Sequence, residues 1–526
     1  MQTRVTGLTG GSRPGWHRRV LAAVFRGVVI LALAGAMPAG AVLFFETNQS
    51  GTITITGCTD PGAVQVPAVI NGLRVTAVGD SAFSGLHELT GVTLPEGVGS
   101  IGALAFADCI ALAGLGLPAS ITNIGEGAFS GCVSLESVTI PSKVVELRRD
   151  VFSHCTSLAV VSVPAGVEAI GDNAFYGCTS LGGITLPAGL LHIGNYAFAQ
   201  AFTLASIGIP GGVVSIPSYA FYGCSGLAEV NITNGVTAVE SYAFYGCSSL
   251  GSIRLPSSLM TIGSHVFHGC WSLGAVQADP ASASFSSRDG VLFDKGGATL
   301  IQYPLAKSGA YTIPAGVGAV GDAAFTGCTG LTSVVMGNGV TRIGSYAFSG
   351  CDQLREVTLG TALTALPEGI FSGCFSLPRI TIPASVGSLG GWVFAYCPGL
   401  VELVFLGNAP TVGEYAFEGV TNSVVSRPGG SSGWGGSLGG LPVTIAGSVA
   451  WAAVSGAGMA GDPARFGFTI VGASNLVVVV EGSAGLGSGA WVPVATNTLT
   501  GGRAGFIDAQ SGVSPRRFYR LRWVNP

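Results

Sequence analysis

Cysteine is the residue of this chain whose number and spacing most suggest chemistry. There are twelve cysteines in 526 residues, and only Cys58 falls outside a 23-residue repeat. In an exported protein such a set would ordinarily form disulfides, and clustered thiolates can also bind zinc. Eleven of them share one slot of the repeat: Cys109, Cys132, Cys155, Cys178, Cys224, Cys247, Cys270, Cys328, Cys351, Cys374 and Cys397.

The occupants of this slot in the other repeats indicate what it is for. Leu86, Ala201 and Val420 stand there instead of cysteine, so the slot behaves as a packing position. Stacked coils would place neighbouring side chains about 4.8 Å apart, whereas the Cβ atoms of a disulfide lie about 3.8 Å apart. We therefore expect buried free thiols, and disulfide pairs and a metal site are the alternatives.

Three motifs match catalytic or nucleotide-binding signatures but lack the context that these require. G-x-G-x-x-G occurs at 97–102 and 316–321, yet a dinucleotide site needs a strand, this turn and a helix together. G-x-S-x-G at 435–439 lies in a glycine-rich tract, which argues against a hydrolase elbow. His265 and His268 are too few ligands for a metal site. We expect no enzyme, no cofactor and no metal.

Aromatic residues form the strongest candidate for a binding surface. The positions two before and one after a repeated phenylalanine should flank one turn and face outward. Stacked rings there would form a stripe about 20 Å long, and rigid amphipathic rings suit a glycan or a protein ligand. The alternative is drift at a tolerant position, since Tyr-Ala-Phe also occurs at 346–348 and 415–417. The candidates are Tyr176, Tyr196, Tyr219, Tyr222, Tyr242 and Tyr245, here called the tyrosine stripe, with Trp271 close by.

The element that must position these residues is the repeat itself. Its phenylalanine recurs without a register error at 83, 106, 129, 152, 175, 198, 221, 244 and 267, and again at 325, 348, 371, 394 and 417. A fixed period of this length indicates a solenoid of stacked coils.

Each coil is expected to contain one strand and one helical turn. In 135–141, Val138 and Ile140 flank Thr139, which predicts a strand with one buried face, ended by proline. A glycine usually follows the next apolar pair, and we expect it to have positive φ at a tight corner. The A-F-x-G-C segment is expected to form a helical or 3₁₀ turn that points alanine and phenylalanine inward.

The full pattern resembles a known family. L-x-x-V-x-I-P-x-x-V-x-x-I-G-x-x-A-F-x-G-C is similar to the BspA-like leucine-rich repeats of bacterial surface proteins, over roughly residues 50–445. The resemblance implies a leucine-rich-repeat solenoid, mostly β, with a parallel sheet and short helical turns. It also implies a secreted or surface-displayed protein, sometimes an adhesin, but no particular ligand.

The rest of the chain divides around the repeats. Residues 1–41 combine five arginines, a short apolar run and a small-residue cleavage site, which predicts a signal peptide. The solenoid with its caps is expected at 42–447, with an insertion at about 279–312 that contains paired strands. We expect a linker at 448–462. Five short strands predict a small β-sandwich or barrel module at 463–526.

These features favour a non-catalytic binding or adhesion scaffold, secreted or at the cell surface, whose partner is an extracellular protein or glycan. The alternative is a purely structural surface or spacer protein whose C-terminal module serves attachment or sorting. A hydrolase hidden in 463–526 is disfavoured because that segment has no histidine or cysteine. Only 10% of residues are charged, which argues against nucleic acid. No membrane span is expected after removal of the signal peptide.

Overall fold

The structure is a computed structural model that divides into two compact units. The first comprises the described residues up to Leu250 together with Ser258–Phe267, and the second comprises Gly251–Ser257 and the described residues from His268 onward. The expected signal peptide lies outside the described residues. Among the described residues no helix has the length and apolarity to cross a membrane. The described ranges are 42–59, 62–421, 423–445, 453–460, 465–471, 477–483, 492–499, 503–507 and 518–523.

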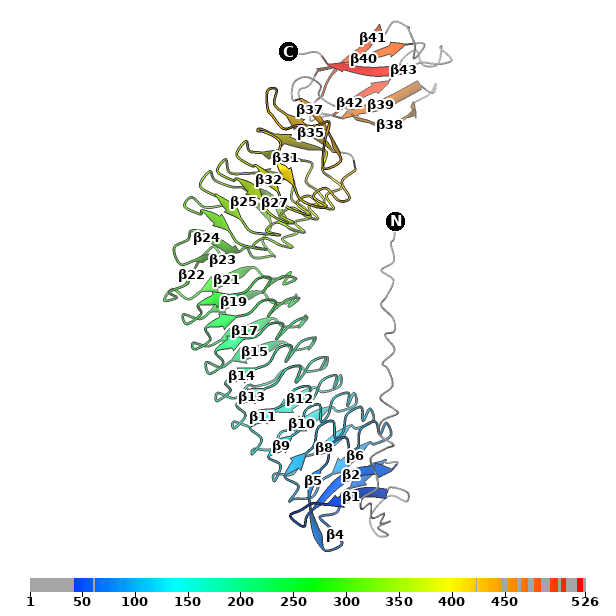
Figure 1. The fold of residues 1–526 in the computed structure, drawn as a ribbon, viewed down its shortest axis with the longest axis vertical. Coiled ribbons are helices and arrows are strands. Elements are labelled where there is room, and N and C mark those ends of the chain that lie inside the picture. The colour runs from blue at the N-terminus through cyan, green and yellow to red at the C-terminus, as the bar shows by residue number, and fades with distance from the viewer. Residues whose placement is uncertain are drawn as a thin grey trace. The chain divides into compact units, whose positions relative to one another are not determined.

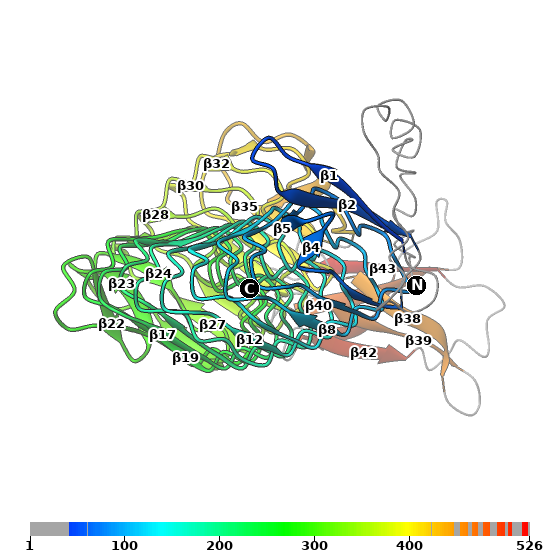
Figure 2. The ribbon, with the colours of Figure 1, turned by 90° about the horizontal axis from the view of Figure 1, so that it is seen from below.

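The first unit begins with strands that precede the regular coils. β1 (Val42–Thr47) pairs antiparallel with β2 (Ile53–Thr59), and β2 pairs parallel with β5 (Leu73–Val78). β4 (Val69–Ile70) forms a hairpin with β5. β1 is the edge strand of a sheet that continues through β2 and β5 to β7 (Ser100–Ile101) and β9 (Asn123–Ile124). Figures 1 and 2 show β1 and β2 beside β5.

Most coils of the first unit contain two short strands, so the prediction of one strand per coil is wrong. In the coil of β14 (His192–Ile193) an isolated bridge between Val160 and Gly183 replaces the first strand. Parallel pairing joins equivalent strands of successive coils at a spacing of 23 residues, for example Ser206 with Glu229. The first strand is β3 (Ala63–Gln65), β6 (Gly91–Thr93), β8 (Gly114–Gly116), β10 (Ser137–Thr139), β12 (Val160–Ser162), β15 (Ser206–Ile209) and β17 (Glu229–Ile232). The second is β7 (Ser100–Ile101), β9 (Asn123–Ile124), β11 (Glu146–Leu147), β13 (Ala169–Ile170), β14 (His192–Ile193), β16 (Ser215–Ile216), β18 (Ala238–Val239) and β20 (Thr261–Ile262).

The second unit repeats this architecture around the expected insertion. The insertion contains the predicted paired strands, because β22 and β24 both pair antiparallel with β23. In the second unit the first strands of the coils are β19 (Ser252–Leu255), β21 (Ala275–Ala278), β25 (Gly309–Thr312), β27 (Leu331–Val335), β29 (Glu356–Thr358), β31 (Arg379–Ile382), β33 (Glu402–Phe405), β35 (Val424–Arg427) and β37 (Leu441–Ile445). The others are β22 (Phe285–Arg288), β23 (Val291–Asp294), β24 (Thr299–Gln302), β26 (Ala319–Val320), β28 (Arg342–Ile343), β30 (Ala365–Leu366), β32 (Ser388–Leu389), β34 (Thr411–Val412) and β36 (Ser437–Leu438).

The repeats of the second unit end with a tryptophan against the last coils. The Trp434 ring packs edge-on against Phe405 at 5.2 Å between centroids, and its Nε1–H donates to the Gly407 carbonyl at 3.3 Å. A partly buried ring with its polar atom satisfied is suited to covering an otherwise open core.

The A-F-x-G-C segment is not helical, and the described residues contain no helix; the expected short helical turns are therefore wrong. Gly127, Phe129 and Gly131 donate their N–H groups to carbonyls of the next coil at 2.7–2.9 Å, while the N–H groups of Ala128 and Cys132 donate to carbonyls three residues earlier and close β-turns. Gly127 and Gly131 have φ of 59° and 76°. A helix needs consecutive right-handed residues and its own i−4 bonds, so this alternation prevents one and bonds the coils to each other.

The corner glycine is needed for close approach rather than for positive φ. A Cβ at Gly125 would lie 2.4 Å from the Ala103 nitrogen, and its φ is outside the left-handed region. Other coils carry Arg148 or Glu240 at this slot, so glycine is required only where the preceding coil lies this close. The glycine with positive φ is instead the one two residues after the phenylalanine, such as Gly131.

Gly125→Ala should therefore destabilise the first unit by about 1–3 kcal/mol through backbone overpacking. Gly114→Ala is the matched control, because a Cβ at Gly114 meets nothing within 4 Å. Urea unfolding of both variants measures the difference. Equal stability of the two would show that the close approach at Gly125 does not constrain the coil.

The core of the coils is a column of stacked phenylalanines. In the first unit successive ring centroids lie 4.9 Å apart at Phe83–Phe106 and 6.1 Å apart at Phe244–Phe267, with nearly parallel planes. In the second unit the column runs from Phe325 to Phe417. Leucine, isoleucine and valine from both strands surround these rings. Because every coil contributes the same side chains, the core is continuous within each unit.

The strands beyond residue 452 form two antiparallel sheets of three strands each. One has the order β38–β39–β42 and the other β41–β40–β43. β38 lies within the span 448–462 that was expected to be a linker. Ile470, Val478, Val480, Leu499 and Phe506 form a buried cluster. A closed sandwich or barrel at 463–526 stays a prediction. The strands are β38 (Ala453–Ala460), β39 (Arg465–Val471), β40 (Val477–Ser483), β41 (Val492–Thr498), β42 (Arg503–Ile507) and β43 (Phe518–Trp523).

Candidate functional site

Three tyrosines of the stripe occupy a position of the turn where the backbone is left-handed. Tyr196, Tyr219 and Tyr242 stand two residues before the buried phenylalanine and have φ of 57°, 61° and 63°. Left-handed backbone is uncommon for a bulky side chain and costs roughly 1–2 kcal/mol. Asn173, a residue type better suited to this conformation, occupies the same position in the preceding coil with φ of 55°. The backbone therefore does not favour tyrosine here.

The rings of these three tyrosines stack in one column with parallel planes. Centroids lie 4.6 Å apart between Tyr196 and Tyr219, with planes 4° apart. The separation is 4.9 Å between Tyr219 and Tyr242, with planes 2° apart. His265 extends this column, stacked 5.2 Å from Tyr242. Sequence analysis assigned His265 no role, although it occupies the position two before Phe267 and so shares the slot of the tyrosines.

A second column completes the site one residue after the phenylalanine. Tyr222 and Tyr245 stack at 5.1 Å. Tyr219 meets Tyr222 edge-on at 5.9 Å, and Tyr242 lies 6.0 Å from Tyr245 at a tilt of 47°. These four tyrosines and Tyr196 are all half-buried, so each of the five rings retains a solvent-accessible part. Aromatic contacts thus join five of the seven candidates into one surface.

Within the described ranges, no ring contact joins the other two candidates to these five tyrosines. Tyr176 packs edge-on against His154 at 5.1 Å, and the buried Ala199 interrupts its column in the next coil. Trp271 belongs to the second unit, where it is half exposed and lies 6.3 Å from His268. The continuous site is therefore Tyr196, Tyr219, Tyr222, Tyr242 and Tyr245, here called the tyrosine ladder.

The tyrosine ladder is nearly free of formal charge. Burial, and then the neighbouring phenols, raise the pKa of Tyr196 and of Tyr245, so their hydroxyls are protonated at neutral pH. The turn segments 193–202, 216–225 and 239–248 contain only one charged residue, Glu240, which accepts a hydrogen bond from Ser215 at 3.0 Å. Such a surface can stack against a sugar ring or an apolar side chain and donate hydrogen bonds.

The cysteines of the repeat are buried donors. The Sγ–H of Cys132 donates to the Phe106 carbonyl at 3.2 Å, and that of Cys224 to Phe198 at 3.1 Å. Burial raises the pKa of Cys224 to about 12. A thiol in this environment stays protonated and is a poor nucleophile and metal ligand. In the part of the chain that the structure describes, no three His, Cys, Asp or Glu side chains gather as a metal site.

We expect iodoacetamide at pH 8 to modify the partly exposed Cys58 before any cysteine of the repeat, and all twelve cysteines after denaturation. The free energy of unfolding should fall as the pH rises from 9 toward 12, because unfolded Cys224 with its ordinary pKa of 9.0 loses the proton that the folded thiol keeps up to about 12. Denatured protein that shows almost no thiol without reductant would instead support the disulfide alternative.

The remaining motifs fall on solenoid elements. Gly97–Gly102 spans the turn that leads into β7, and Ser437 lies in β36 beside its antiparallel partner β37. Neither has the strand–turn–helix context of a nucleotide site or a nucleophile elbow.

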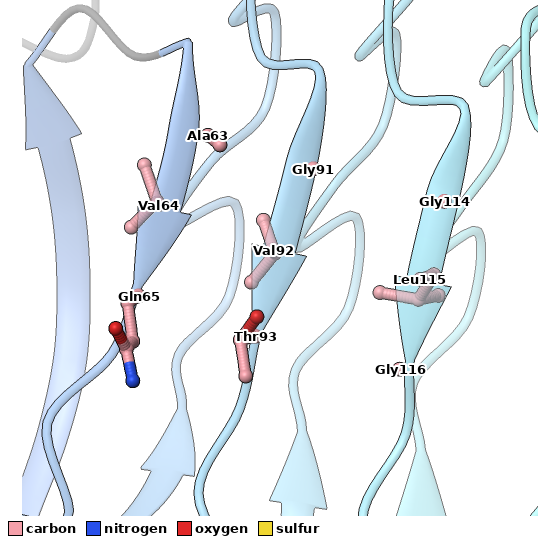
Figure 3. A pocket seen from close by; sticks show the side chains of 9 residues that line it. All are labelled: Ala63, Val64, Gln65, Gly91, Val92, Thr93, Gly114, Leu115 and Gly116. Carbon is pink, nitrogen blue, oxygen red and sulfur yellow. The ribbon is translucent and has the colours of Figure 1, made fainter. Parts of the chain in front are cut away.

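Two shallow depressions lie on the outer faces of the first-strand sheets. One, of about 570 Å³, lies over β3, β6 and β8. Figure 3 shows Gln65 and Thr93 toward one end of it, while Gly91, Gly114 and Gly116 leave the strands bare. The other, of about 460 Å³, lies over β29 and β31, where Arg379 already pairs with Glu402 at 3.2 Å. Neither gathers polar groups that converge on one point.

Comparison with protein families identifies the repeat. The model of the BspA type leucine rich repeat region matches in six copies, over residues 76–204, 191–287 and 307–424. Comparison with curated proteins gives no match.

Comparison with solved structures gives matches to bacterial proteins. A leucine rich cell surface protein from Faecalibacterium prausnitzii is 27% identical, covers 72% of this chain and 89% of its own, and has a TM-score of 0.46. A leucine-rich repeat protein from Bacteroides ovatus is 24% identical over 74% of this chain and 93% of its own, with a TM-score of 0.47. The pneumococcal vaccine antigen PcpA is 21% identical over 76% and 87%, with a TM-score of 0.43.

Proposed function

Because the chain belongs to the BspA-type leucine-rich repeat family, we propose that it is a secreted or surface-displayed scaffold that binds an extracellular protein or glycan without catalysis. The family membership and the basic, apolar leader at 1–41 support export. We further propose that the C-terminal strands form a separate all-β module, which the buried cluster around Ile470 and Phe506 supports.

The tyrosine ladder is the observation that carries the binding role. Five rings line up over consecutive coils, with stacked separations of 4.6–5.1 Å, and they remain partly open to solvent. Tyr196, Tyr219 and Tyr242 occupy left-handed positions that would suit glycine or asparagine better. Rigid rings with protonated hydroxyls give a large contact area at small entropic cost, as binding hot spots do.

The ladder favours an extended, uncharged ligand surface. Its rings repeat along one direction, whereas the near absence of charge gives no attraction for an anionic polymer. A neutral oligosaccharide chain or an apolar strip of a protein has the matching chemistry.

The test is a screen of the purified full chain against a glycan array and immobilised extracellular-matrix proteins. The proposal predicts at least one saturable ligand whose signal falls in the Tyr222→Ala/Tyr245→Ala variant. A screen with no ligand, or ligands that bind both proteins equally, would instead support the spacer role.

A further inference from the structure

The second unit carries a separate aromatic cluster that no part of the tyrosine ladder includes. The Trp392 ring lies 4.8 Å from Tyr415 and 6.4 Å from Tyr396, each tilted by 31°. Tyr415 is 57% exposed and Tyr396 is 52% exposed. Exposed aromatic side chains that contact one another can mark an interaction site.

Their positions in the repeat show that the fold does not require these rings. Trp392 and Tyr415 stand two residues before the phenylalanine with φ of 58° and 56°. Tyr396 stands two after it, also at 56°, where the neighbouring coils have Gly373 and Gly419 at 73° and 72°. Bulky residues are outliers in this conformation, and the exposed rings of Tyr396 and Tyr415 contribute little core packing to offset its cost.

The turns of the cluster and of the two preceding coils carry acidic residues and no basic ones. The turn segments 344–352, 366–375, 389–398 and 412–420 contain Asp352, Glu368, Glu414 and Glu418 but no lysine or arginine. The backbone N–H of Trp392 donates to the backbone carbonyl of Glu414 at 3.1 Å, and the backbone N–H of Tyr396 donates to the backbone carbonyl of Glu418 at 2.6 Å. Glu414 and Glu418 therefore belong to the backbone that runs directly beside the two rings.

Of these carboxylates, those of Glu414 and Glu418 are available to a ligand, whereas that of Glu368 is already hydrogen-bonded. Glu368 accepts a hydrogen bond from the Tyr346 hydroxyl at 2.6 Å, which raises the pKa of Tyr346 to about 12. Glu414 and Glu418 are exposed, and in the described residues neither side chain has a hydrogen bond or an ion pair. The cluster thus combines open aromatic faces with unpaired negative charge, whereas the turn segments of the tyrosine ladder hold only Glu240.

We propose that Trp392, Tyr396 and Tyr415, with Glu414 and Glu418, form a recognition site for an arginine side chain in a basic segment of a partner protein. A planar guanidinium can stack on an aromatic face and donate hydrogen bonds to a carboxylate at the same time. A lysine ammonium lacks the planar face, and a quaternary ammonium cannot donate a hydrogen bond, so the geometry and the charge together select arginine.

The test uses the full chain and a fluorescein-labelled nona-arginine peptide, with nona-lysine and tetramethylammonium as comparison ligands. We expect saturable binding of nona-arginine, several-fold weaker binding of nona-lysine, and no competition by tetramethylammonium. Glu414→Gln/Glu418→Gln should weaken nona-arginine binding about tenfold or more, as should Tyr415→Ala. Both sets of side chains are exposed, so thermal unfolding should be unchanged.

The control for nonspecific attraction to an acidic protein is Glu136→Gln/Glu229→Gln, which removes the same charge from exposed residues of the first unit. Equal weakening by both double variants would overturn the proposal, because binding would then follow net charge. Equal affinity for nona-lysine and nona-arginine, or displacement by tetramethylammonium, would overturn the assignment to arginine. The tyrosine-ladder variant should bind nona-arginine normally, so failure of either proposal leaves the other testable.

Discussion

Replacing Phe221 with alanine should lower the free energy of unfolding by about 3–5 kcal/mol. Phe221 is fully buried and stacks 5.4 Å from Phe198 and 5.3 Å from Phe244. Its removal leaves a cavity in the middle of the phenylalanine column, and the backbone on either side is held by bonds between coils that resist collapse. Denaturant unfolding measures the loss.

The damage should spread to both neighbouring coils. The Phe221 N–H donates to the Ala243 carbonyl at 2.9 Å, and its own carbonyl accepts from Cys247 Sγ at 3.3 Å. Repeat stability couples through such nearest-neighbour contacts. Hydrogen exchange should therefore accelerate in the coils of Phe198 and Phe244, whereas Phe202→Ala, at a ring that is 45% exposed, should leave them protected. Acceleration confined to the coil of Phe221 would contradict the coupling.

Tyr222→Ala/Tyr245→Ala should weaken ligand binding by about 2–4 kcal/mol, a 30-fold to 1,000-fold rise in Kd. The double change removes one stacked pair and the edge contacts that this pair makes with Tyr219 and Tyr242. Only half-buried side chains are lost, and the phenylalanine column is untouched, so Tm should fall far less than it does for Phe221→Ala.

Two controls separate binding from general effects. Tyr176→Ala changes the same repeat position in a coil where the ring packs against His154 and makes no ring contact with the ladder. Phe202→Ala removes an exposed aromatic ring of the same unit. Both variants should bind as the unchanged chain does. Weakening of equal size in either would show that the ladder has no special role.

The register of the repeats could be predicted from sequence because the same side chains return at each coil. Phenylalanine, cysteine and the strand residues each occupy one slot, so a single pattern fixes the core. The second strand was missed because it has two residues per coil, as in Ala169–Ile170, and is visible only through its pairing with the next coil. The helical or 3₁₀ turn was expected because it points alanine and phenylalanine inward, and the sequence pattern does not reveal that the backbone conformation alternates along this segment.

The candidate site was predictable only in part for the same reason. The two slots that face outward were identified, and the structure joins Tyr219, Tyr222, Tyr242 and Tyr245 as the 23-residue spacing implies. Ala199 stands between Tyr176 and Tyr222 in the column one residue after the phenylalanine, and this interruption is visible in the sequence once the two columns are considered separately. Trp392 occupies the same slot as Tyr219, two residues before the phenylalanine, and could have been identified there. Tyr396 lies two residues after the phenylalanine, where most coils have glycine, and the pattern gives no reason to expect a ligand-binding residue at that position.

Isothermal titration of one ligand from the screen into the unchanged chain and into Tyr222→Ala/Tyr245→Ala, with Tm recorded for both, tests the binding role most directly. The account predicts a Kd at least 30-fold higher for the variant, with folding preserved. An unchanged Kd, or a loss of binding that tracks a loss of folded protein, would contradict it.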